Sequence, residues 1–249
     1  MGTTSLACHE IDTADTRLLR QLVHRLPYGE MREAVAKNIE KLTNAGIARL
    51  STPLWASPVV MVRKKDVGWR MCVDYRRLNF VTKFYCFPLP RLDEALDAFA
   101  SATVFLSLEL AMAYHQVPMK LADVEKTEFI THVVFYEMMK MPFGHCNALS
   151  TYQDLMMSVL QSLIGRICLA YLDDVIVFSK RCDRHVNDSR AVLDRIRDAE
   201  LKLKPAKCKL FCKQVLYLGQ VIVPAGVFHD PAKLRVLADW PLPTNVRES

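Results

Sequence analysis

The sequence predicts an α+β fold in which helices pack on one face of a sheet. Apolar stripes at helical spacing alternate with short apolar runs of strand length along the chain. Two of these runs, 167–170 and 175–178, are separated only by Tyr171-Leu172-Asp173-Asp174, which is typical of a tight turn between antiparallel strands. Such a hairpin argues against a doubly wound parallel sheet. With 249 residues and 51% hydrophobic content, the chain can build one large domain or two lobes.

The first third of the chain predicts a helix followed by a strand hairpin. Apolar residues recur at helical spacing over 31–45, and Gly46 is well placed to cap the end of that helix. Two apolar runs follow at 59–62 and 71–73, and residues 63–70 between them are rich in Lys and Arg. This segment therefore predicts a hairpin with a basic tip.

The rest of the chain predicts three more helices and one more strand besides the hairpin at the acidic turn. An apolar stripe over 92–99 indicates a second helix, and the run 104–109 indicates a strand that ends in Glu109. Stripes over 152–163 and 186–199 indicate a third and a fourth helix. No linker rich in Pro, Gly and Ser divides the sequence, so any division into lobes must come from packing.

The adjacent pair Asp173 and Asp174 is the strongest candidate for chemistry. A turn between two buried strands would place both carboxylates outside the core, at one edge of the sheet. Mg²⁺ prefers carboxylate oxygens and keeps substrate phosphates among its other ligands, so the pair suits phosphoryl transfer. By itself, the pair is more often an ordinary Asp-rich hairpin turn, because such turns are common.

The composition predicts a globular protein of a reducing compartment. The 33 Lys and Arg against 27 Asp and Glu leave a net charge of +6, which allows a polyanionic partner without requiring one. The eight cysteines lack the spacing of a disulfide framework. Cys208 and Cys212 could join distant histidines in a zinc site, but no second ligand pair has finger-like spacing, so we expect buried thiols and no structural metal.

Without a signal-peptide core or a membrane-spanning apolar run, we expect a soluble intracellular protein with no membrane contact.

Eight short blocks occur in a fixed order along the chain. They are WASPVV (55–60), WRMCVDYRRLN (69–79), FPLPRLDEALDA (87–98), YHQVP (114–118), MPFG (141–144), YLDDVIVFSK (171–180), LKLKPAKC (201–208) and YLGQVI (217–222). In this order they resemble the reverse transcriptase of gypsy-type long-terminal-repeat retrotransposons, over almost the whole chain. A lone Asp pair could arise by chance, but an ordered series of this length is highly specific.

The resemblance implies a right-hand polymerase fold. It would comprise fingers and palm subdomains, an antiparallel palm sheet backed by helices, and a thumb that is missing or only begun. The implied subdomains are an N-terminal extended arm (1–30), fingers (31–101), a first part of the palm (102–121), a return through fingers and palm (122–146), the palm with the catalytic hairpin and primer grip (147–230) and the start of a thumb or connector (231–249).

The resemblance also implies a catalytic metal site. Two Mg²⁺ ions, with Mn²⁺ as an alternative, would be held by Glu109, Asp173, Asp174 and the backbone carbonyl of Leu110. They would activate the primer 3′-hydroxyl and neutralise the triphosphate. The family has an aspartate where this chain has Glu109, which keeps the charge but adds one methylene. Because a misplacement of about 1 Å can cost about 100-fold in rate, we expect impaired chemistry.

Further residues are implied to bind the nucleotide and the primer. The nucleotide set is Lys64, Arg70, Ala113, Tyr114, Phe143, Gly144 and Lys207, and the primer grip is Tyr217, Leu218 and Gly219. Lys64 and Arg70 would grip the triphosphate, and Tyr114 would clash with a ribose 2′-hydroxyl. Without the resemblance, the two cations would be interpreted as a solvated turn, Tyr114 as a half-buried strand aromatic, and 217–219 as a plain hairpin strand.

Two functions of different classes remain open at this stage. The first is an RNA-directed DNA polymerase domain that acts on an RNA or DNA template-primer and dNTPs, within a Pol polyprotein or as a dimer. Its implied location is the cytoplasm or nucleus, inside virus-like particles for an intact element. The second is an inactive remnant that keeps at most a nucleic-acid-binding cleft, which Glu109, Met112, His145 and Leu149 favour because each departs from the family pattern. A Mg²⁺-dependent nuclease is disfavoured, because no block suggests a water-activating base.

Overall fold

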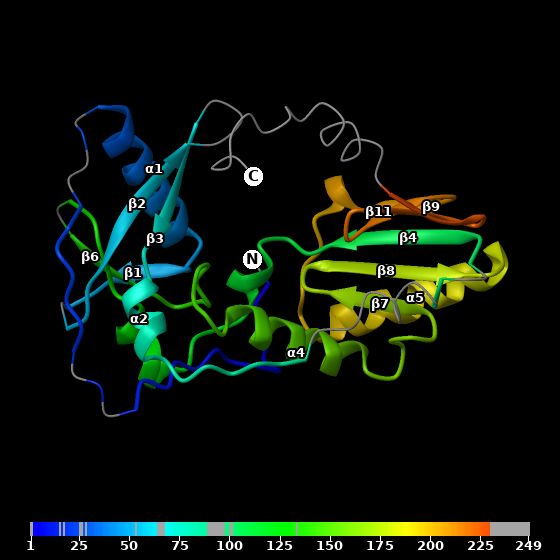
Figure 1. The fold of residues 1–249 in the computed structure, drawn as a ribbon, viewed down its shortest axis with the longest axis horizontal. Coiled ribbons are helices and arrows are strands. Elements are labelled where there is room, and N and C mark those ends of the chain that lie inside the picture. The colour runs from blue at the N-terminus through cyan, green and yellow to red at the C-terminus, as the bar shows by residue number, and fades with distance from the viewer. Residues whose placement is uncertain are drawn as a thin grey trace, which may run out of the picture.

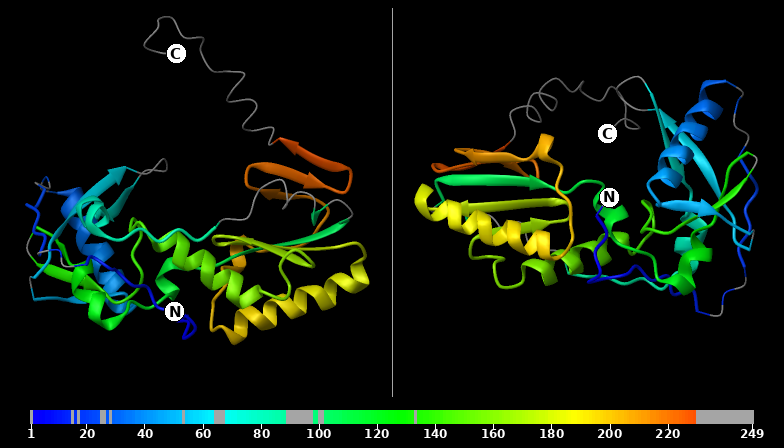
Figure 2. Two further views of the ribbon diagram at one scale, coloured as in Figure 1. Left: turned by 60° about the horizontal axis from the view of Figure 1, so that its bottom comes forward. Right: turned by 180° about the vertical axis from the view of Figure 1, so that it is seen from behind.

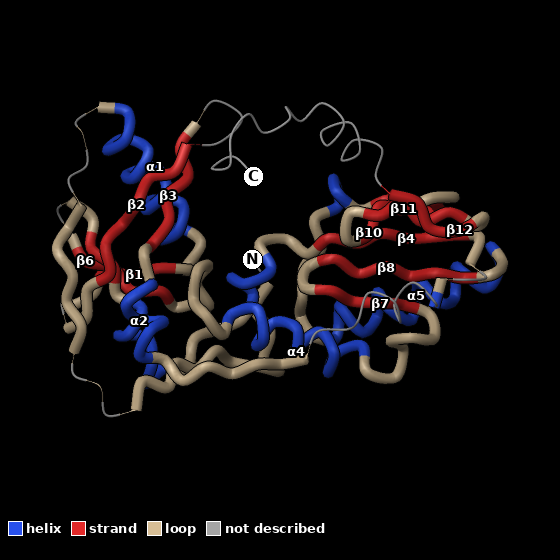
Figure 3. Tube along the Cα trace, viewed as in Figure 1, coloured by secondary structure: helices blue, strands red, loops and turns tan. Residues whose placement is uncertain are grey.

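The chain forms two lobes that lie side by side, with helix α4 between them (Figure 1). The computed structural model describes residues 2–14, 16, 18–24, 27, 29–52, 54–63, 68–88, 98–99, 102–132 and 134–229. Each lobe contains its own sheet with helices packed against it. In Figure 3 the red strands form one group in each lobe, and blue helices lie beside each group. The predicted α+β class is therefore confirmed.

The first lobe is built around a five-stranded sheet and two helices. Its strands run in the order β1-β6-β5-β2-β3, and only the β2–β5 pair is parallel. The elements are α1 (Glu30–Asn44), β1 (Ala48–Leu50), β2 (Ser57–Arg63), β3 (Trp69–Val73), α2 (Arg76–Val81), β5 (Phe129–Ile130) and β6 (Phe135–Met138). The predicted basic hairpin is confirmed as β2 and β3, with Val62 opposite Arg70. Its tip, including Lys64, lies outside the described residues.

Helix α1 matches its prediction to within one residue at each end. It packs Val35 and Ile39 into the core of the first lobe. Gly46 follows with φ at 66°, a left-handed conformation that a side chain would disfavour. The N–H of Gly46 then donates to the carbonyl of Thr43 (3.0 Å), and the N–H of Ile47 donates to that of Leu42 (2.8 Å). The predicted cap is confirmed, and it turns the chain directly into β1.

The second lobe is built on an antiparallel sheet in the order β7-β8-β4-β9. Helices α4 and α5 cover one face of it, as the turned views show (Figure 2). The elements are β4 (Val104–Glu109), α4 (Ala148–Leu160), β7 (Cys168–Tyr171), β8 (Asp174–Ser179), α5 (Cys182–Asp198) and β9 (Lys209–Cys212). A separate three-stranded sheet contains β10 (Val215–Tyr217), β11 (Gln220–Val223) and β12 (Gly226–His229). The predicted strand 104–109 and the hairpin at the acidic turn are both confirmed.

Alternation along the strands of this lobe produces two cores. Successive side chains of a strand point to opposite faces, so Leu106 and Leu108 of β4 pack with the helices. Phe105 of the same strand packs on the other face, with Ile176 and Phe178 of β8. Burial on both faces fixes the register of β4 against β8, because a one-residue slip would exchange the two cores.

The helix bounds of the second lobe differ from the predictions. Helix α4 begins at Ala148 instead of 152, directly after Asn147, whose side chain is bonded to the segment at Lys83 and Tyr85. Helix α5 begins at Cys182 instead of 186, since its first turn is polar and carries little of the apolar stripe. The predicted helix 92–99 lies mostly outside the described residues. The described residues also form three short 3₁₀ helices, η1 (Ala113–Gln116), η2 (Leu121–Thr127) and η3 (Pro205–Lys207).

The cysteines are all unpaired thiols. Cys208 and Cys212 are half-exposed rather than buried as predicted, because they lie at and beside the edge strand β9. Within the described part of the chain, we find no helix with the length and apolarity needed to cross a bilayer.

The N-terminal segment is anchored by a buried pair of histidines. Nε2 of His9 and Nδ1 of His145 share a hydrogen bond of 2.7 Å, although 136 residues separate them in sequence. Nδ1 of His9 also contacts the hydroxyl of Thr151 on α4 (3.0 Å). Burial lowers the pKa of His9 to about 3 and the pKa of His145 to about 4. Both imidazoles are therefore neutral at physiological pH.

We expect the folded chain to lose stability as the pH falls from about 6.5 toward 4. The unfolded chain takes up protons at the ordinary histidine pKa, whereas folded His9, His115 and His145 do not until their lowered pKa values of about 3, 4 and 4. Each contributes a loss of about 1.4 kcal/mol per pH unit within that window. His145→Leu should reduce the pH dependence of the free energy of unfolding by about 1.4 kcal/mol per pH unit, which corresponds to one proton. Urea unfolding at pH 5 and 7 measures this slope. His229→Leu, at an exposed histidine, is the control, and an unchanged slope in His145→Leu would contradict this account.

Candidate active site

The acidic turn joins β7 to β8 at the end of the second lobe's sheet. Tyr171 pairs with Asp174 across the hairpin, which leaves Leu172 and Asp173 at its tip. Leu172 has φ at 54°, a left-handed conformation that is costly for a leucine. Both aspartates are exposed. The turn thus places two carboxylates outside the core, as the sequence predicts.

Glu109 lies beside this turn because β4 and β8 are neighbours. It ends β4 directly opposite Asp174. The N–H of Leu110 donates to the carbonyl of Asp173 (3.2 Å), and this bond ties the end of β4 to the tip of the turn. Partial burial, followed by the charges of Asp173 and Glu109, raises the pKa of Asp174. The three carboxylates therefore form one electrostatically coupled group.

Lys207 occupies the position of a counterion in this group. Its Nζ forms an ion pair with Oε1 of Glu109, and this hydrogen bond raises the pKa of Lys207. Its charge also opposes the upward shift in the pKa of Asp174. In this arrangement the carboxylates do not converge: among the described residues, no group of three or more His, Cys, Asp and Glu side chains could hold a metal ion. The donor set consists of hard oxygens that suit Mg²⁺, but Glu109 must first leave Lys207.

An aromatic cluster lies next to the carboxylates. Tyr114 contacts Phe143 and Tyr152 edge to face, with ring centroids 4.8 and 5.6 Å apart. Burial and the nearby charge of Asp173 raise the pKa of Tyr114. Tyr114 belongs to the 3₁₀ helix η1, so the alternative of a strand aromatic is wrong. Ala113 precedes it and is buried.

The backbone around this cluster takes two left-handed conformations. Gly144, beside Phe143, has φ at 86°, which favours glycine. Met112 has φ at 49° and is exposed at the start of η1. A small polar residue, which the resemblance implies at this position, would adopt that conformation more readily than Met112.

The hairpin at Tyr217, Leu218 and Gly219 reaches the same region. Tyr217 is buried, and Leu218 and Gly219 both have positive φ, of 50° and 80°. Two such residues form the tight turn that joins β10 to β11. After burial, the charge of Asp174 contributes to a raised pKa of Tyr217. This hairpin therefore lies within electrostatic range of the acidic turn.

A model of the family described as reverse transcriptase (RNA-dependent DNA polymerase) matches residues 62–222. The matched range contains Glu109, Asp173, Asp174 and the aromatic cluster. The chain belongs to the reverse transcriptase family.

Known relatives of this reverse transcriptase chain are transposon polyproteins. It is 34% identical over 228 residues to the retrovirus-related Pol polyprotein from transposon 297 of Drosophila melanogaster, which covers 89% of this chain and 22% of the relative. It is 36% identical over 223 residues to that from transposon opus of the same organism, which covers 88% and 22%. The chain thus spans about a fifth of the length of these relatives.

Solved structures show the fold. The foamy viral protease-reverse transcriptase in complex with RNA/DNA hybrid has a TM-score of 0.88 at 18% identity, covering 99% of this chain and 33% of that chain. A complex of the same foamy viral protein with double-stranded DNA has a TM-score of 0.89, covering 99% and 43%. The predicted polymerase fold of fingers and palm is confirmed. Reverse transcriptases in general use divalent metal ions.

The structure brings only part of the predicted nucleotide set of this reverse transcriptase domain together. Lys207 pairs with Glu109, Tyr114 lies within electrostatic range of Asp173, and Phe143, followed by Gly144, packs against Tyr114. Arg70 is exposed on β3 of the first lobe, which lies across from the acidic turn (Figure 1). Lys64 lies outside the described residues.

Two positioning amides were missed by the sequence interpretation. Asn79 accepts from the N–H of Cys146 (2.9 Å) and donates to the carbonyl of Gly144 (2.8 Å), which fixes the loop that carries Phe143. Gln153 of α4 bonds to the backbone of the acidic turn. A buried glutamine inside the apolar stripe of α4 was the available signal, because a buried amide needs partners.

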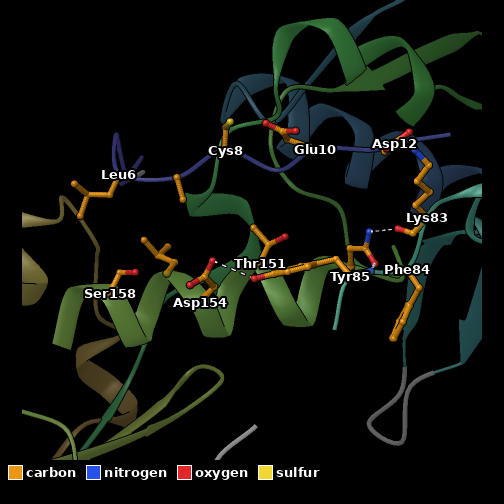
Figure 4. Close-up of a pocket in the computed structure, with 13 residues that line it drawn as sticks. Leu6, Cys8, Glu10, Asp12, Lys83, Phe84, Tyr85, Thr151, Asp154 and Ser158 are labelled. Atoms are coloured by element: carbon orange, nitrogen blue, oxygen red, sulfur yellow. Dashed lines mark hydrogen bonds and ion pairs between the residues drawn. The ribbon is translucent and has the colours of Figure 1, made fainter. Parts of the chain in front are cut away.

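A hollow of about 440 Å³ lies against the face of α4 that carries Thr151, Asp154 and Ser158 (Figure 4). The N-terminal segment and residues 83–85 form its other walls, and Oη of Tyr85 lies 3.5 Å from Oδ2 of Asp154 across it. None of the predicted site residues lines it. This hollow is therefore separate from the carboxylate site.

Proposed function

We propose that the chain is the fingers and palm part of an RNA-directed DNA polymerase that adds dNTPs to a primer 3′-hydroxyl. The observation that carries this proposal is the turn with Asp173 and Asp174, beside the end of the strand that carries Glu109. Within this assignment, residues 1–30 are an extended arm, 31–101 the fingers, 102–121 and 147–230 the palm, 122–146 a return between them, and 231–249 the start of a thumb or connector.

The carboxylates Glu109, Asp173 and Asp174, with the carbonyl of Leu110, would hold two Mg²⁺ ions, or Mn²⁺. A metal bound there would lower the pKa of the primer 3′-hydroxyl and would neutralise negative charge on the leaving pyrophosphate. The carboxylates contribute the negative charge that makes such binding favourable. The exposure of both aspartates leaves them accessible to metal ions that also bind substrate phosphates.

The remaining side chains would position the nucleotide and the primer. Lys207, Arg70 and Lys64 are cations that stabilise charge on the triphosphate. Tyr114, held edge to face between Phe143 and Tyr152, would contact the sugar and exclude a 2′-hydroxyl. Ala113 and Gly144 would line the nucleotide with it, and the hairpin at Tyr217, Leu218 and Gly219 would hold the primer end.

The proposed partners are an RNA or DNA template-primer, dNTPs and the remainder of a Pol polyprotein or a second copy of the chain. The proposed location is the cytoplasm or nucleus, with virus-like particles for an intact element. Support for nucleic acid comes from the foamy viral protein, whose solved complexes contain double-stranded DNA or RNA/DNA hybrid.

A second candidate function is an inactive remnant that binds nucleic acid. The ion pair between Glu109 and Lys207 favours it. Glu109 is a proposed metal ligand and Lys207 a proposed triphosphate ligand, and in this pair each binds the other instead. Extension of a DNA primer on an RNA template separates the two functions. Template-dependent incorporation supports the polymerase, whereas no incorporation in Mg²⁺ or Mn²⁺, with or without Glu109→Asp, leaves the remnant.

We expect binding to an RNA/DNA hybrid to weaken steeply with salt. Contacts made mainly to phosphates release counterions, and six or more of them give about a 10³-fold loss of affinity between 50 and 200 mM salt. Fluorescence anisotropy over that range checks the slope. Asp173→Asn should keep the slope while losing extension, because it removes no cation. An affinity that is absent or independent of salt would contradict both candidate functions.

A further inference from the structure

Gln153 is fully buried on α4 and bonds to both sides of the point where β7 ends. Its Nε2 donates to the carbonyl of Ala170 (3.2 Å), and its Oε1 accepts from the N–H of Leu172 (2.9 Å). The donor end and the acceptor end of one amide are thus both satisfied by the backbone of the acidic turn.

The conformation held by these bonds is one that the turn disfavours on its own. Leu172 has φ at 54°, where the Cβ of a leucine crowds its own backbone. Such a conformation is costly and persists only where the surroundings impose it. The bond from Gln153 to the N–H of Leu172 is a restraint of this kind, applied from a rigid helix.

A second restraint acts on the other side of the same turn. The N–H of Leu110 donates to the carbonyl of Asp173 (3.2 Å). The backbone of the turn is therefore held by α4 at Leu172 and by the end of β4 at Asp173. The side chains of Asp173 and Asp174 remain exposed. A fixed backbone that carries accessible carboxylates limits how far Asp173 and Asp174 must move to bind a metal ion once Glu109 leaves Lys207.

We propose that Gln153 is the positioning residue of the carboxylate site. It fixes the backbone from Ala170 to Leu172, directly before Asp173 and Asp174, and so limits the movement that these two carboxylates need to bind a divalent ion. The proposal rests on the proposed polymerase function. Gln153 reaches the site only through the backbone. Partners of this kind, one step removed from the metal ligands, account for about 10–100-fold in metal affinity or activity.

A purely structural role makes a different prediction. A glutamine that only fills space in the core could be replaced by methionine, which is similar in length and unbranched, with no effect on metal affinity in the folded protein. A positioning glutamine requires both ends of its amide. Asparagine keeps the amide but is one methylene shorter, so it cannot reach Ala170 and Leu172 together.

The test compares Gln153→Met and Gln153→Asn with Gln161→Met, which changes an exposed glutamine directly after α4. Circular dichroism confirms folding, and Mn²⁺ alone is titrated by calorimetry. We expect a 10–100-fold weaker Kd for Mn²⁺ in both Gln153 variants, together with faster amide hydrogen exchange at Leu172. In primer extension, kcat should fall while KM for the template-primer stays within about twofold. Gln161→Met should match the unsubstituted chain.

Folded Gln153 variants that bind Mn²⁺ as tightly as the unsubstituted chain would overturn the proposal. If Gln153→Met does not fold, Gln153→Asn decides the outcome. Failure of the proposed function is a different result, because the unsubstituted chain itself would then bind no Mn²⁺ and extend no primer. That result would overturn the positioning role as well.

Discussion

Asp173→Asn is expected to reduce primer extension by about three orders of magnitude or more. Asparagine keeps the shape of the side chain but removes a full negative charge from the group formed with Asp174 and Glu109. Metal-based stabilisation of the transition state amounts to several kcal/mol, and each 1.36 kcal/mol corresponds to tenfold in rate. Single-turnover extension of a labelled primer on an RNA template measures the change.

The matched control is Asp198→Asn. Asp198 is an exposed aspartate at the end of α5, where it pairs with Arg197 and is not a member of the carboxylate group. It loses the same charge with the same change of shape, so it should extend primers as the unsubstituted chain does. An Asp173→Asn variant that stays within tenfold of this control would show that Asp173 holds no catalytic metal.

Glu109→Asp is expected to increase the extension rate, by up to about 100-fold. The carboxylate of Glu109 is bound to Lys207, and the extra methylene gives it that reach. Aspartate would draw the carboxylate back toward the end of β4, where the backbone pairs with Asp174, by about one C–C bond length, and displacements of about 1 Å can change rates about 100-fold. It would also release Lys207 for the triphosphate.

The concentration of Mg²⁺ at half-maximal rate should fall together with this gain. Glu125→Asp, at an exposed glutamate of η2, is the control and should change neither quantity. Equal rates and equal Mg²⁺ requirements for Glu109→Asp and the unsubstituted chain would mean that the length of the side chain at this position is not limiting.

The sequence predicts the local parts of this site well because their signals are local. The acidic turn follows from two apolar runs four residues apart, and the cap at Gly46 follows from the end of an apolar stripe. Glu109 was found because it ends a strand. Each of these features depends on neighbours within a few residues, where periodicity and turn chemistry carry the information.

The contacts that complete the site join residues far apart in the sequence. Lys207 meets Glu109 across 98 positions, and His9 meets His145 across 136. Pairings of this kind depend on how β4, η3 and the N-terminal segment pack, and no periodicity encodes them. The hydrogen bonds of Gln153 span only 17 and 19 positions in the sequence. They still depend on tertiary packing, because they require helix α4 to lie against the acidic turn. The predicted start of α4 was wrong for a related reason. The helix begins directly after Asn147, and the side chain of Asn147 is fixed by hydrogen bonds to the distant residues Lys83 and Tyr85.

The most direct test of the central claim is primer extension by four chains on one homopolymer template in Mg²⁺ and in Mn²⁺. The chains are the unsubstituted protein, Glu109→Asp, Asp173→Asn and the double variant. We predict that Glu109→Asp exceeds the unsubstituted chain and that Asp173→Asn abolishes extension in both backgrounds, because all three carboxylates serve one metal site. If Glu109→Asp gains nothing while Asp173→Asn loses nothing, the carboxylates do not form the catalytic centre.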